Sequence, residues 1–292
     1  MAAGSNSGAA RPRRDIVGAI DALPPLPAVA LRVMQVAQDP KSSASDLAIV
    51  VSSDPGLSAR ILRIVNSAAY RRSREIGSVQ EALVMLGFVQ ARNISISGAI
   101  AGAYSPDALN ALFRIETFWR HSIAVAFKAS ELAGKSRRID VPSAFTAGIL
   151  HNIGRLAMFY HDPAGLDQAV AAAIAGDVPI EVVERESLGF DNTEVGDALA
   201  EKWKLPDEIR AAIHHHHDAD LHEATIAGVV AEADRFCTGN GLLPGYVVPL
   251  DAGTHAQPPD DFLRLSKQVD ALMELVIGNP VNVRSTTKAG AA

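Results

Sequence analysis

The side chains of this chain that could do chemistry are histidines and carboxylates spread over several segments. His121 and His151 lie on separate segments, a run of four histidines covers residues 214–217, and Asp234 follows in the sequence AEADRF. Imidazole nitrogens and carboxylate oxygens are ligands that divalent transition metals accept, and helical bundles build such sites from facing helices. A helical histidine is also commonly a packed residue with a satisfied ring. Spacing alone therefore leaves a metal site and a structural role both open.

The single cysteine, Cys237, limits the ligands that any metal site could use. One cysteine can form neither a disulfide within the chain nor a cysteine zinc site, so a metal would rest on histidine and carboxylate ligands. This cysteine usage is typical of intracellular proteins. We therefore expect a cytoplasmic location.

Charge and hydropathy narrow the classes of partner. The 27 basic and 33 acidic side chains leave a net charge of −6, which argues against bulk capture of nucleic acid, because that binding depends on Lys and Arg. The longest uncharged stretches, 93–106 and 236–250, fall short of the roughly 18 apolar residues that a membrane span needs. Residues 1–14 carry three arginines without the apolar core of a secretory signal. We expect no membrane insertion and a disordered basic arm over 1–14.

The elements that position the histidines are expected to be helices. Apolar residues recur at helical spacing with little alternation of period two, and the 48% apolar content excludes wholesale disorder. We expect His121 on a helix over 114–132 and His151 in a nearly charge-free segment, 143–160, that is buried on most sides. Further helices are expected over residues 29–36, 47–50, 55–70, 79–86, 89–96, 163–175, 179–187, 193–202, 206–214 and 220–236.

Two of these helices begin with clear capping signals. Ser43 to Asp46 has the shape of a capping box, in which each of the two side chains bonds the other residue's backbone. Asp54 precedes Pro55, which places a carboxylate at the N-cap and a proline at the first helical position. Both signals predict where a helix starts.

The order of the histidines and the aspartate resembles the HD superfamily of metal-dependent phosphohydrolases, named for an adjacent His-Asp pair. His121 in FWRHS matches the first histidine of that family, His151 in AGILHNIGRL matches the histidine of the pair, and Asp234 matches the distal aspartate. The aspartate of the pair is replaced by Asn152, whose neutral amide offers a carbonyl oxygen but no negative charge. The resemblance implies a metal site that lacks one of its charges.

The first hundred residues make the resemblance narrower, because they are similar to the HDOD family, a degenerate signalling branch of the HD group. Several stretches in the right order carry this similarity, which covers roughly Asp15 to Phe236. They are LPPLPAVALRVMQVAQDP, SDLAIVVSSDPGLSARILRIVNSAAY, IGSVQEALVMLGFVQARN and LGFDNTEVGDALAEKWKLPDEIRAAIHHHH. Asn66 and Ser67 match a family hallmark, for which a local role in bending or ending a helix is the plain interpretation. Asn192 stands where related enzymes often carry another histidine, so two ligand positions are altered.

The run of four histidines needs separate treatment. Successive helical residues point about 100° apart, so four in a row cannot share one site, and on a helix only a pair such as His214 and His217 shares a face. The family resemblance instead aligns His216 and His217 with a ligand pair. The alternative is a solvated helix end, where imidazolium complements the helix dipole. Both interpretations remain open.

The fold class that these observations predict is all-α, a multi-helix bundle in two packed subdomains. The resemblance implies an HDOD domain over 15–237, divided into an N-terminal helical subdomain, 15–112, and an HD-like subdomain, 113–237. A loop over 238–259, a C-terminal amphipathic helix over 260–278 and a flexible tail over 279–292 complete the chain. The amphipathic helix is expected to fold back onto a subdomain or to make a homodimer contact.

Two functions from different classes compete. The resemblance to the HDOD family implies a non-catalytic signalling or regulatory module that acts through a protein partner or a small regulatory ligand, and we favour it. The alternative is a metal-dependent phosphohydrolase with a reduced site, in which metal could rest on His121, His151, His217 and Asp234. Because two ligand positions are altered, we expect no confident catalytic residue, no required cofactor, and at most a weakly bound divalent metal well below one equivalent.

A cluster of arginines is the remaining candidate for a partner site. Such a patch could meet an anionic partner, although most groups of this kind are a solvated face. Its members are Arg60, Arg63, Arg71, Arg72 and Arg74. We do not expect nucleic acid as that partner.

Overall fold

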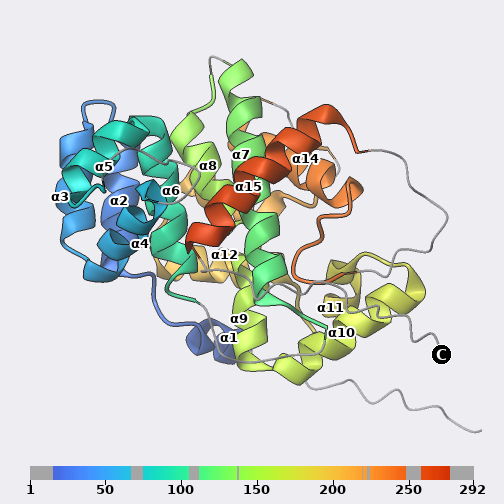
Figure 1. Ribbon diagram of the computed structural model, residues 1–292. Coiled ribbons are helices and arrows are strands. Elements are labelled where there is room, and N and C mark those ends of the chain that lie inside the picture. Colours follow the sequence, from blue (N-terminus) through green and yellow to red (C-terminus); the bar gives the residue numbers. More distant parts are fainter. Residues whose placement is uncertain are drawn as a thin grey trace, which may run out of the picture.

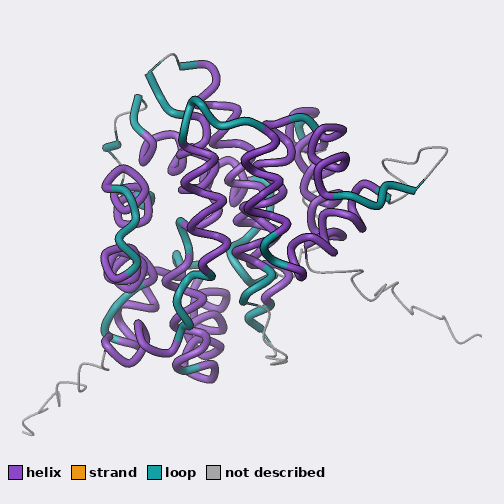
Figure 2. Tube along the Cα trace, turned by 90° about the vertical axis from the view of Figure 1, so that its left-hand side faces the viewer, coloured by secondary structure: helices purple, strands orange, loops and turns teal. Residues whose placement is uncertain are grey.

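A computed structural model describes residues 16–66, 75–104, 112–136, 138–218, 220–221, 224–247 and 258–276 of the chain, without the side chains of 274–276. Within these ranges the regular structure is helical, without strands, so the expected all-α class is confirmed (Figures 1 and 2). The helices are α1 (Ile16–Ala22), α2 (Ala28–Gln38), α3 (Ala44–Ser52), α4 (Pro55–Val65), α5 (Val79–Leu86), α6 (Phe88–Ala101), α7 (Ile115–Lys135), α8 (Val141–Leu150), α9 (Ile153–His161), α10 (Pro163–Gly176), α11 (Ile180–Leu188), α12 (Asn192–Lys202), α13 (Asp207–His215), α14 (Ile226–Gly239) and α15 (Asp260–Val276).

Helices α2 to α6 form one end of the molecule, shown in blue to teal in Figure 1. Both predicted capping signals are present: the Ser43 backbone N–H donates to Asp46 at 2.8 Å, and Asp54 Oδ1 accepts from the Leu57 backbone N–H at 2.7 Å. These caps satisfy N–H groups that would otherwise lack a partner at the helix start. The predicted helix over 55–70 is described only to Val65, where α4 ends.

Asn66 explains why α4 ends at this point. Its amide donates to Ile76 O and accepts from Ile76 N, both at 2.8 Å, and so holds the segment that precedes α5. A side chain that bonds a distant backbone in both directions competes with helix continuation. Asn66 thus stands at the end of α4 as predicted, but its side chain bonds Ile76, ten residues away, rather than nearby backbone, and Ser67 lies outside the described residues.

Helix α7 passes through the middle of the molecule and packs against α8, α14 and α15 (Figure 1). Phe118 and Trp119 on α7 are fully buried, and the Trp119 indole N–H donates to Tyr104 O at 3.2 Å, so the ring is packed without an orphaned polar atom. The buried apolar residues of both halves of the chain form one continuous cluster around α7. The boundary near residue 112 stays a prediction.

Helices α8 and α9 divide the predicted segment 143–160 in two. The break falls at His151 and Asn152, between Leu150 and Ile153. Glycines let neighbouring helices approach this junction: a Cβ atom on Gly148 would lie 2.5 Å from Ala126 Cα, and one on Gly154 would lie 2.0 Å from Asn192 O. Small residues therefore bring α7 and α12 close to the residues at the break.

The two ends of the described chain pack onto this bundle. The sequence patterns did not predict α1, which lies against α9 and α12, with Gly18 beneath the His161 ring. Helix α15 folds back onto α7, α6 and α4, as one of the two alternatives expected, and buries Leu265, Val269 and Leu272. The amphipathic spacing predicted a buried face of Phe262, Leu263, Leu265, Val269, Leu272, Leu275 and Val276; three of these are buried, whereas Leu263 is 44% exposed.

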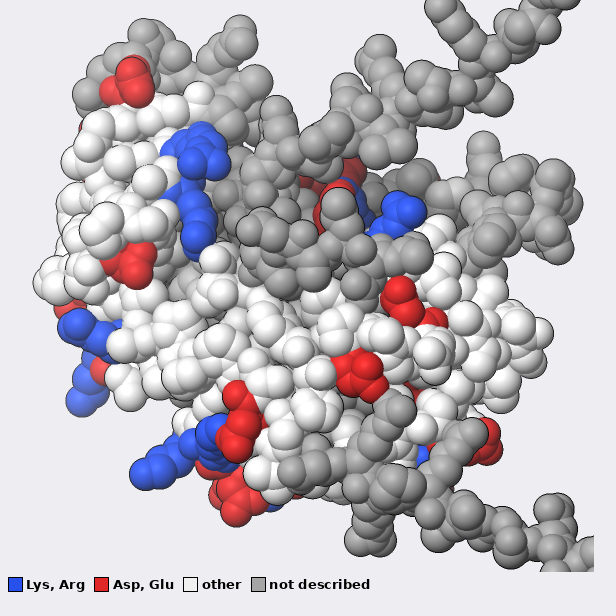
Figure 3. Space-filling model, turned by 90° about the horizontal axis from the view of Figure 1, so that it is seen from below, with Lys and Arg blue, Asp and Glu red and all other residues white. Residues whose placement is uncertain are grey.

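No single helix within the described ranges is both long and apolar enough to cross a membrane. The pair α5 and α6 would pass such a test only when counted together, and the two helices are bent by 120° at Gly87. Charged side chains are interspersed on the face shown in Figure 3, where Lys and Arg lie among Asp and Glu on a largely uncharged surface.

Candidate functional site

Four histidines and one aspartate converge where α7, the α8–α9 junction, α14 and the end of α13 meet. His121 comes from the middle of α7, His151 from the junction, and Asp234 from α14. His216 and His217 follow the last residue of α13. Residues far apart in sequence are thus brought together by the helices that surround α7.

His121, His151 and Asp234 form the tightest part of the cluster. His121 Nε2 lies 3.2 Å from His151 Nε2 and 3.1 Å from Asp234 Oδ1, and His151 Nε2 lies 3.9 Å from the same oxygen. Both histidines are fully buried. The matches proposed from the sequence for these three residues therefore meet in space.

The backbone fixes which nitrogen of each ring faces inward. His121 Nδ1 lies 2.7 Å from Leu242 O, and His151 Nδ1 lies 2.7 Å from Gly148 O. A carbonyl oxygen can only accept, so each Nδ1 carries a proton and the Nε2 atoms turn lone pairs toward Asp234. Lone pairs and a carboxylate oxygen at these distances repel unless a proton or a cation lies between them. Backbone carbonyls commonly orient metal-binding histidines in this way.

His216 and His217 extend the cluster on the other side of Asp234. The ring centroids of His151 and His216 are 4.9 Å apart, those of His216 and His217 are 4.0 Å apart, and His217 Nδ1 lies 3.9 Å from Asp234 Oδ2. His216 Nδ1 lies 2.9 Å from Ile213 O, and the Nε2 atoms of both rings are buried without a hydrogen-bond partner in the described structure. Because His216 Nδ1 faces a carbonyl, His216 Nε2 carries a buried lone pair without a donor, which is a second sign of a cation-binding set.

The four-histidine run corrects the helical argument. The expected pair His214 and His217 does not share a face, because the helix ends at His215 and the 100° rule no longer applies beyond it. The neighbours His216 and His217 enter the cluster instead. His215 pairs with Asp218 at 2.8 Å at the surface, and His214 lies 3.9 Å from Asp197.

The two asparagines stand beside His151 in a buried network. Asn152 Nδ2 lies 2.7 Å from His151 Nε2, and Asn152 Oδ1 accepts from Asn192 Nδ2 at 2.7 Å. Arg155 Nη1 donates to Asn152 Oδ1 at 3.3 Å, and Arg155 Nη2 donates to Asn192 Oδ1 at 3.0 Å. Two donors on Asn152 Oδ1 fix the orientation of this amide, so its N–H group points at the lone pair of His151.

Glu184 on α11 holds the guanidinium of Arg155 in place. Arg155 Nε donates to Glu184 Oε1 at 2.6 Å and Nη2 donates to Oε2 at 3.4 Å, and the Asn192 backbone N–H donates to Oε2 at 3.1 Å. Both side chains are fully buried. Burial raises the pKa of the Glu184 carboxyl, and the charge and hydrogen bonds of Arg155 oppose that rise. The result is a fixed internal cation next to the asparagines.

Burial and mutual repulsion lower the pKa values of three of the imidazoles, His151, His216 and His217. Burial and the charge of His216 lower the pKa of His151 well below its usual value. Burial lowers the pKa of His216 to about 3 and that of His217 to about 4. Burial opposes ionisation of Asp234, but the hydrogen bond and charge of His121 hold its pKa below the usual range. Three imidazoles that favour the neutral form and one carboxylate that favours the ionised form thus lie together, which is the charge state that a divalent cation requires of such ligands.

Two groups of side chains in the described residues could each hold a divalent cation. Asp234 belongs to both groups. One group adds His121 and His151, and the other adds His216 and His217. The Asn152 amide reaches the same His151 Nε2 atom that faces His121 and Asp234. The Arg155 guanidinium, paired with Glu184, donates to the side-chain oxygens of both asparagines.

Sequence reasoning missed Arg155, Glu184 and the Leu242 carbonyl. A signal for Arg155 was available, because it is the one Lys, Arg, Asp or Glu residue in the segment 143–160, and a buried charge needs a partner. Nothing in the sequence pairs it with Glu184 on a distant helix. Leu242 contributes only its backbone, which leaves no mark in the residue types.

The arginine patch is only partly described. Arg60 turns inward, where Nη1 donates to Gly98 O at 2.7 Å and Nη2 to Gly102 O at 3.3 Å at the end of α6. Arg63 is exposed near the end of α4. Arg71, Arg72 and Arg74 lie outside the described residues. Arg60 thus caps α6, because the last carbonyls of a helix lack partners within it.

A model of the HDOD domain matches residues 23–219. The chain belongs to the HDOD domain family. An HDOD domain protein of Geobacter sulfurreducens has a similar structure, with a TM-score of 0.67, 25% identity, and coverage of 90% of this chain and 89% of that one. A proposed phosphohydrolase of Shewanella amazonensis SB2B is also similar, with a TM-score of 0.64, 28% identity, and coverage of 90% and 97%.

One curated relative is much longer than the part of it that this chain matches. An uncharacterized protein of Treponema pallidum is 25% identical over 205 residues, which are 70% of this chain. This chain spans only 39% of the length of that relative. The likenesses place the chain in the HD superfamily without deciding its activity.

Proposed function

We propose that this HDOD chain is a non-catalytic regulatory module that acts by binding a protein or a small ligand. The observation that carries the proposal is the guanidinium of Arg155, which bonds Asn152 at 3.3 Å and Asn192 at 3.0 Å. In a two-metal phosphohydrolase a pair of cations clamps the attacking and leaving oxygens. Here the guanidinium, neutralised by Glu184, engages the side-chain oxygens of the two asparagines, which are then not open to a metal ion.

The state of His151 supports the same conclusion. Its Nε2 lone pair receives the Asn152 amide N–H at 2.7 Å, so a cation at His151 would compete with a hydrogen bond. An aspartate at position 152 would add negative charge there, whereas the amide supplies a donor. The asparagine therefore weakens the site in two ways, by lost charge and by a lone pair already engaged.

Enclosure of the site argues against turnover of a phosphate ester. His121, His151, Asn152 and Asn192 are all 0% exposed. A substrate phosphoryl group must come within contact distance of the activated water and the metal, which requires an open position in the coordination sphere. The side chains of His217 and Asp234 are 24% and 10% exposed, so the cluster reaches solvent at that edge, whereas its fully buried members are suited to holding helices together.

A single divalent cation remains compatible with His121, His151 and Asp234, or with His216, His217 and Asp234. Such an ion would supply Lewis acidity and would link α7, α14 and the α8–α9 junction. The chain's own residues set the terms: carbonyl groups orient the rings, and Asp234 provides the negative charge. We propose weak binding, because the carboxylate of an HD pair is replaced by Asn152.

The alternative function is a metal-dependent phosphohydrolase with a reduced site. The convergence of four imidazoles and a carboxylate favours it, as does the likeness to the proposed phosphohydrolase of Shewanella amazonensis. In that case a cation held by His121, His151, Asp234 and His217 would activate water, and an opening of the surrounding helices would have to admit the substrate.

Hydrolysis assays separate the two proposals. The purified full chain is incubated with Mn²⁺, Fe²⁺ or Mg²⁺ and with nucleotides, cyclic dinucleotides or bis-p-nitrophenyl phosphate. We expect no turnover above that of His151→Ala. Turnover that disappears in His151→Ala and persists in His215→Ala, an exposed histidine of the same run, would overturn the regulatory proposal and establish the enzyme.

The remaining proposals concern the binding partners and the cellular compartment. We propose a signalling protein or a small regulatory ligand as the partner, a homodimer as one form of interaction, and the cytoplasm as the compartment. Mixed charge on the face in Figure 3 supports a partner other than nucleic acid, which needs a basic surface. Arg63 remains available for an anionic partner, whereas Arg60 is engaged with α6.

A further inference from the structure

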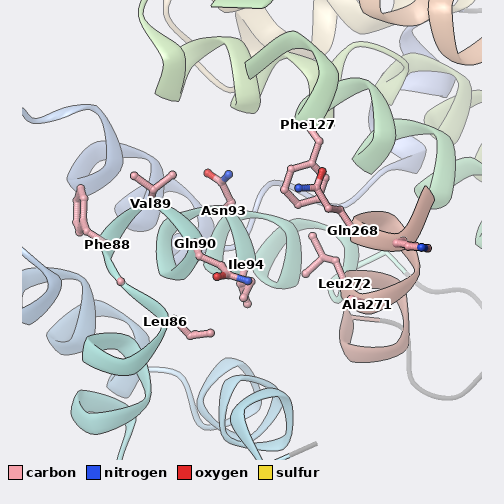
Figure 4. A pocket seen from close by; sticks show the side chains of 12 residues that line it. Leu86, Phe88, Val89, Gln90, Asn93, Ile94, Phe127, Gln268, Ala271 and Leu272 are labelled. Carbon is pink, nitrogen blue, oxygen red and sulfur yellow. The ribbon is translucent and has the colours of Figure 1, made fainter. Parts of the chain in front are cut away.

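A cavity of about 730 Å³ lies between the α5–α6 bend and the C-terminal helix α15. Figure 4 shows Leu86, Ile94 and Leu272 around this space, with Phe127 reaching in from α7. Ligand-binding pockets for small molecules commonly have volumes of about 300 to 1,000 Å³ and walls that are mainly apolar. In size and lining the cavity fits a small molecule. It is separate from the histidine cluster, which contributes none of its lining residues.

The wall formed by α15 is outside the residues that match the family model. That match ends at residue 219, whereas α15 runs over Asp260–Val276. The cavity therefore forms between helices of the matched domain and a helix that follows it. Its α15 side is held by buried Val269 and Leu272 on the face that meets α7, α6 and α4.

The polar groups of the cavity favour a ligand that carries a negative charge and accepts hydrogen bonds. The lining contains one charged side chain, the Lys267 ammonium, and no carboxylate, although acidic residues outnumber basic ones in the chain. Lys267 is exposed at the α15 side and has no ion-pair partner within the described residues. A lone cation at an apolar cavity complements a negative group on a ligand.

A buried amide gives a second and independent indication. Asn93 is only 6% exposed and lines the cavity. Its Oδ1 accepts from Arg92 Nε at 3.2 Å, and its Nδ2 has no partner among the residues that the structure describes. An amide N–H at the cavity wall without a protein acceptor is able to donate to an acceptor group on a bound ligand. Gln268 adds another amide on the α15 side (Figure 4).

We propose that this cavity binds a small amphipathic anion, with its apolar body between α6 and α15 and its anionic group beside Lys267. The ligand contacts both α6 and α15, so it ties the C-terminal helix to the family-matched domain. The inference deepens the proposed regulatory function and rests on it for the biological meaning of the ligand. Binding itself does not depend on the state of the histidine cluster.

Binding to the full chain is tested with decanoate below its micelle concentration, by calorimetry and by thermal unfolding. We expect one decanoate per chain and, at a hundred times the Kd, a rise in Tm of about 5 to 10 °C. Decanol tests the apolar body without the charge, and decyltrimethylammonium tests the opposite charge. The affinity should fall in that order, from decanoate to decanol to decyltrimethylammonium.

Two variants and a matched control locate the site. Lys267→Glu should weaken decanoate about fivefold or more and leave decanol unchanged. Ala271→Trp, on the wall of the cavity, should abolish binding of both, while Lys41→Glu, an exposed lysine elsewhere, should change neither. Unfolding of each variant without ligand shows that it is folded. Decanoate bound equally well by Ala271→Trp, or equally well by Lys267→Glu, would overturn the proposal.

The outcome is independent of the hydrolysis assays. Absence of decanoate binding overturns the cavity proposal and leaves the regulatory proposal as it stands. Turnover at the histidine cluster overturns the regulatory proposal and leaves decanoate binding as it stands. A concentration-dependent dimer that Ala271→Trp disrupts, with no decanoate binding, would assign the cavity to a second copy of the chain and overturn the small-ligand proposal.

Discussion

Removal of the Arg155 guanidinium is the perturbation that tests the internal network most severely. In Arg155→Met, Glu184 loses hydrogen bonds of 2.6 and 3.4 Å, and Asn192 Oδ1 loses its donor at 3.0 Å. Asn152 Oδ1 keeps the Asn192 amide at 2.7 Å. Breaking a buried ion pair costs about 3 to 5 kcal/mol, and an orphaned buried acceptor costs about 1 kcal/mol or more. We expect a loss of about 4 to 6 kcal/mol in the free energy of unfolding at pH 8.

The loss should depend on pH with a definite sign. Without Arg155, burial is the largest influence on Glu184 and is opposed by the Asn192 backbone N–H, so the folded-state pKa of the carboxyl stands above the unfolded value. Such a group stabilises the fold below the unfolded pKa, and this contribution is lost as the pH rises through the folded pKa. The deficit of Arg155→Met relative to the parent should therefore be about 1 to 3 kcal/mol smaller at pH 5.5 than at pH 8.

Urea unfolding followed by circular dichroism at the two pH values measures both quantities. The matched control is Arg185→Met, which removes an arginine that is 63% exposed and pairs with Asp191, and which should cost about 1 kcal/mol at most. The double variant Arg155→Met with Glu184→Met should recover much of the loss, because no buried charge remains unpaired. A cost below about 1 kcal/mol for Arg155→Met, or a cost independent of pH, would refute the account of a buried, paired guanidinium.

Three further outcomes are expected. In protein treated with a chelator, the depressed pKa values of His216 and His217, about 3 and 4, mean that the unfolded state binds more protons below pH 6.5. The free energy of unfolding should therefore be highest above pH 6.5 and should fall by about 2 kcal/mol for each ring by pH 5. The total loss should be smaller than twice this value, because the two rings interact. Urea unfolding that shows no such loss would contradict the burial of these rings in neutral form. Gly154→Ala, whose Cβ would lie 2.0 Å from Asn192 O, should lower the free energy of unfolding by about 2 kcal/mol or more, while Gly134→Ala, with open space around it, should raise or preserve it. Asn152→Asp should bind Mn²⁺ about tenfold more tightly by calorimetry, and unchanged affinity would show that the missing carboxylate is not what weakens the site.

The sequence predicted the helices well because their signals are local. The capping residues Ser43 and Asp54 and the amphipathic spacing of α15 each act through neighbouring residues. Boundaries failed where tertiary packing decides them. The break between α8 and α9 lies in a uniformly apolar segment without proline, and α1 is a short helix whose single fully buried residue is Ala19.

The candidate site was predictable only in part for the same physical reason. His121, His151 and Asp234 were found by their order, and the structure brings them together. The choice of His216 and His217 over His214 depends on the helix end at His215, which no spacing rule supplies. The pairing of Arg155 with Glu184 is a contact between two helices far apart in sequence, and single-sequence patterns contain no information about such pairs.

The most direct test of the central claim is the number of metal ions that the full chain can hold. Protein reconstituted with Mn²⁺ or Fe²⁺, desalted and subjected to elemental analysis should contain at most one ion per chain. His121→Ala should lower this number, because His121 is a ligand in the triad of His121, His151 and Asp234. Two ions per chain, both lost in His151→Ala, would contradict the claim that Arg155 keeps the side-chain oxygens of the two asparagines from a metal ion.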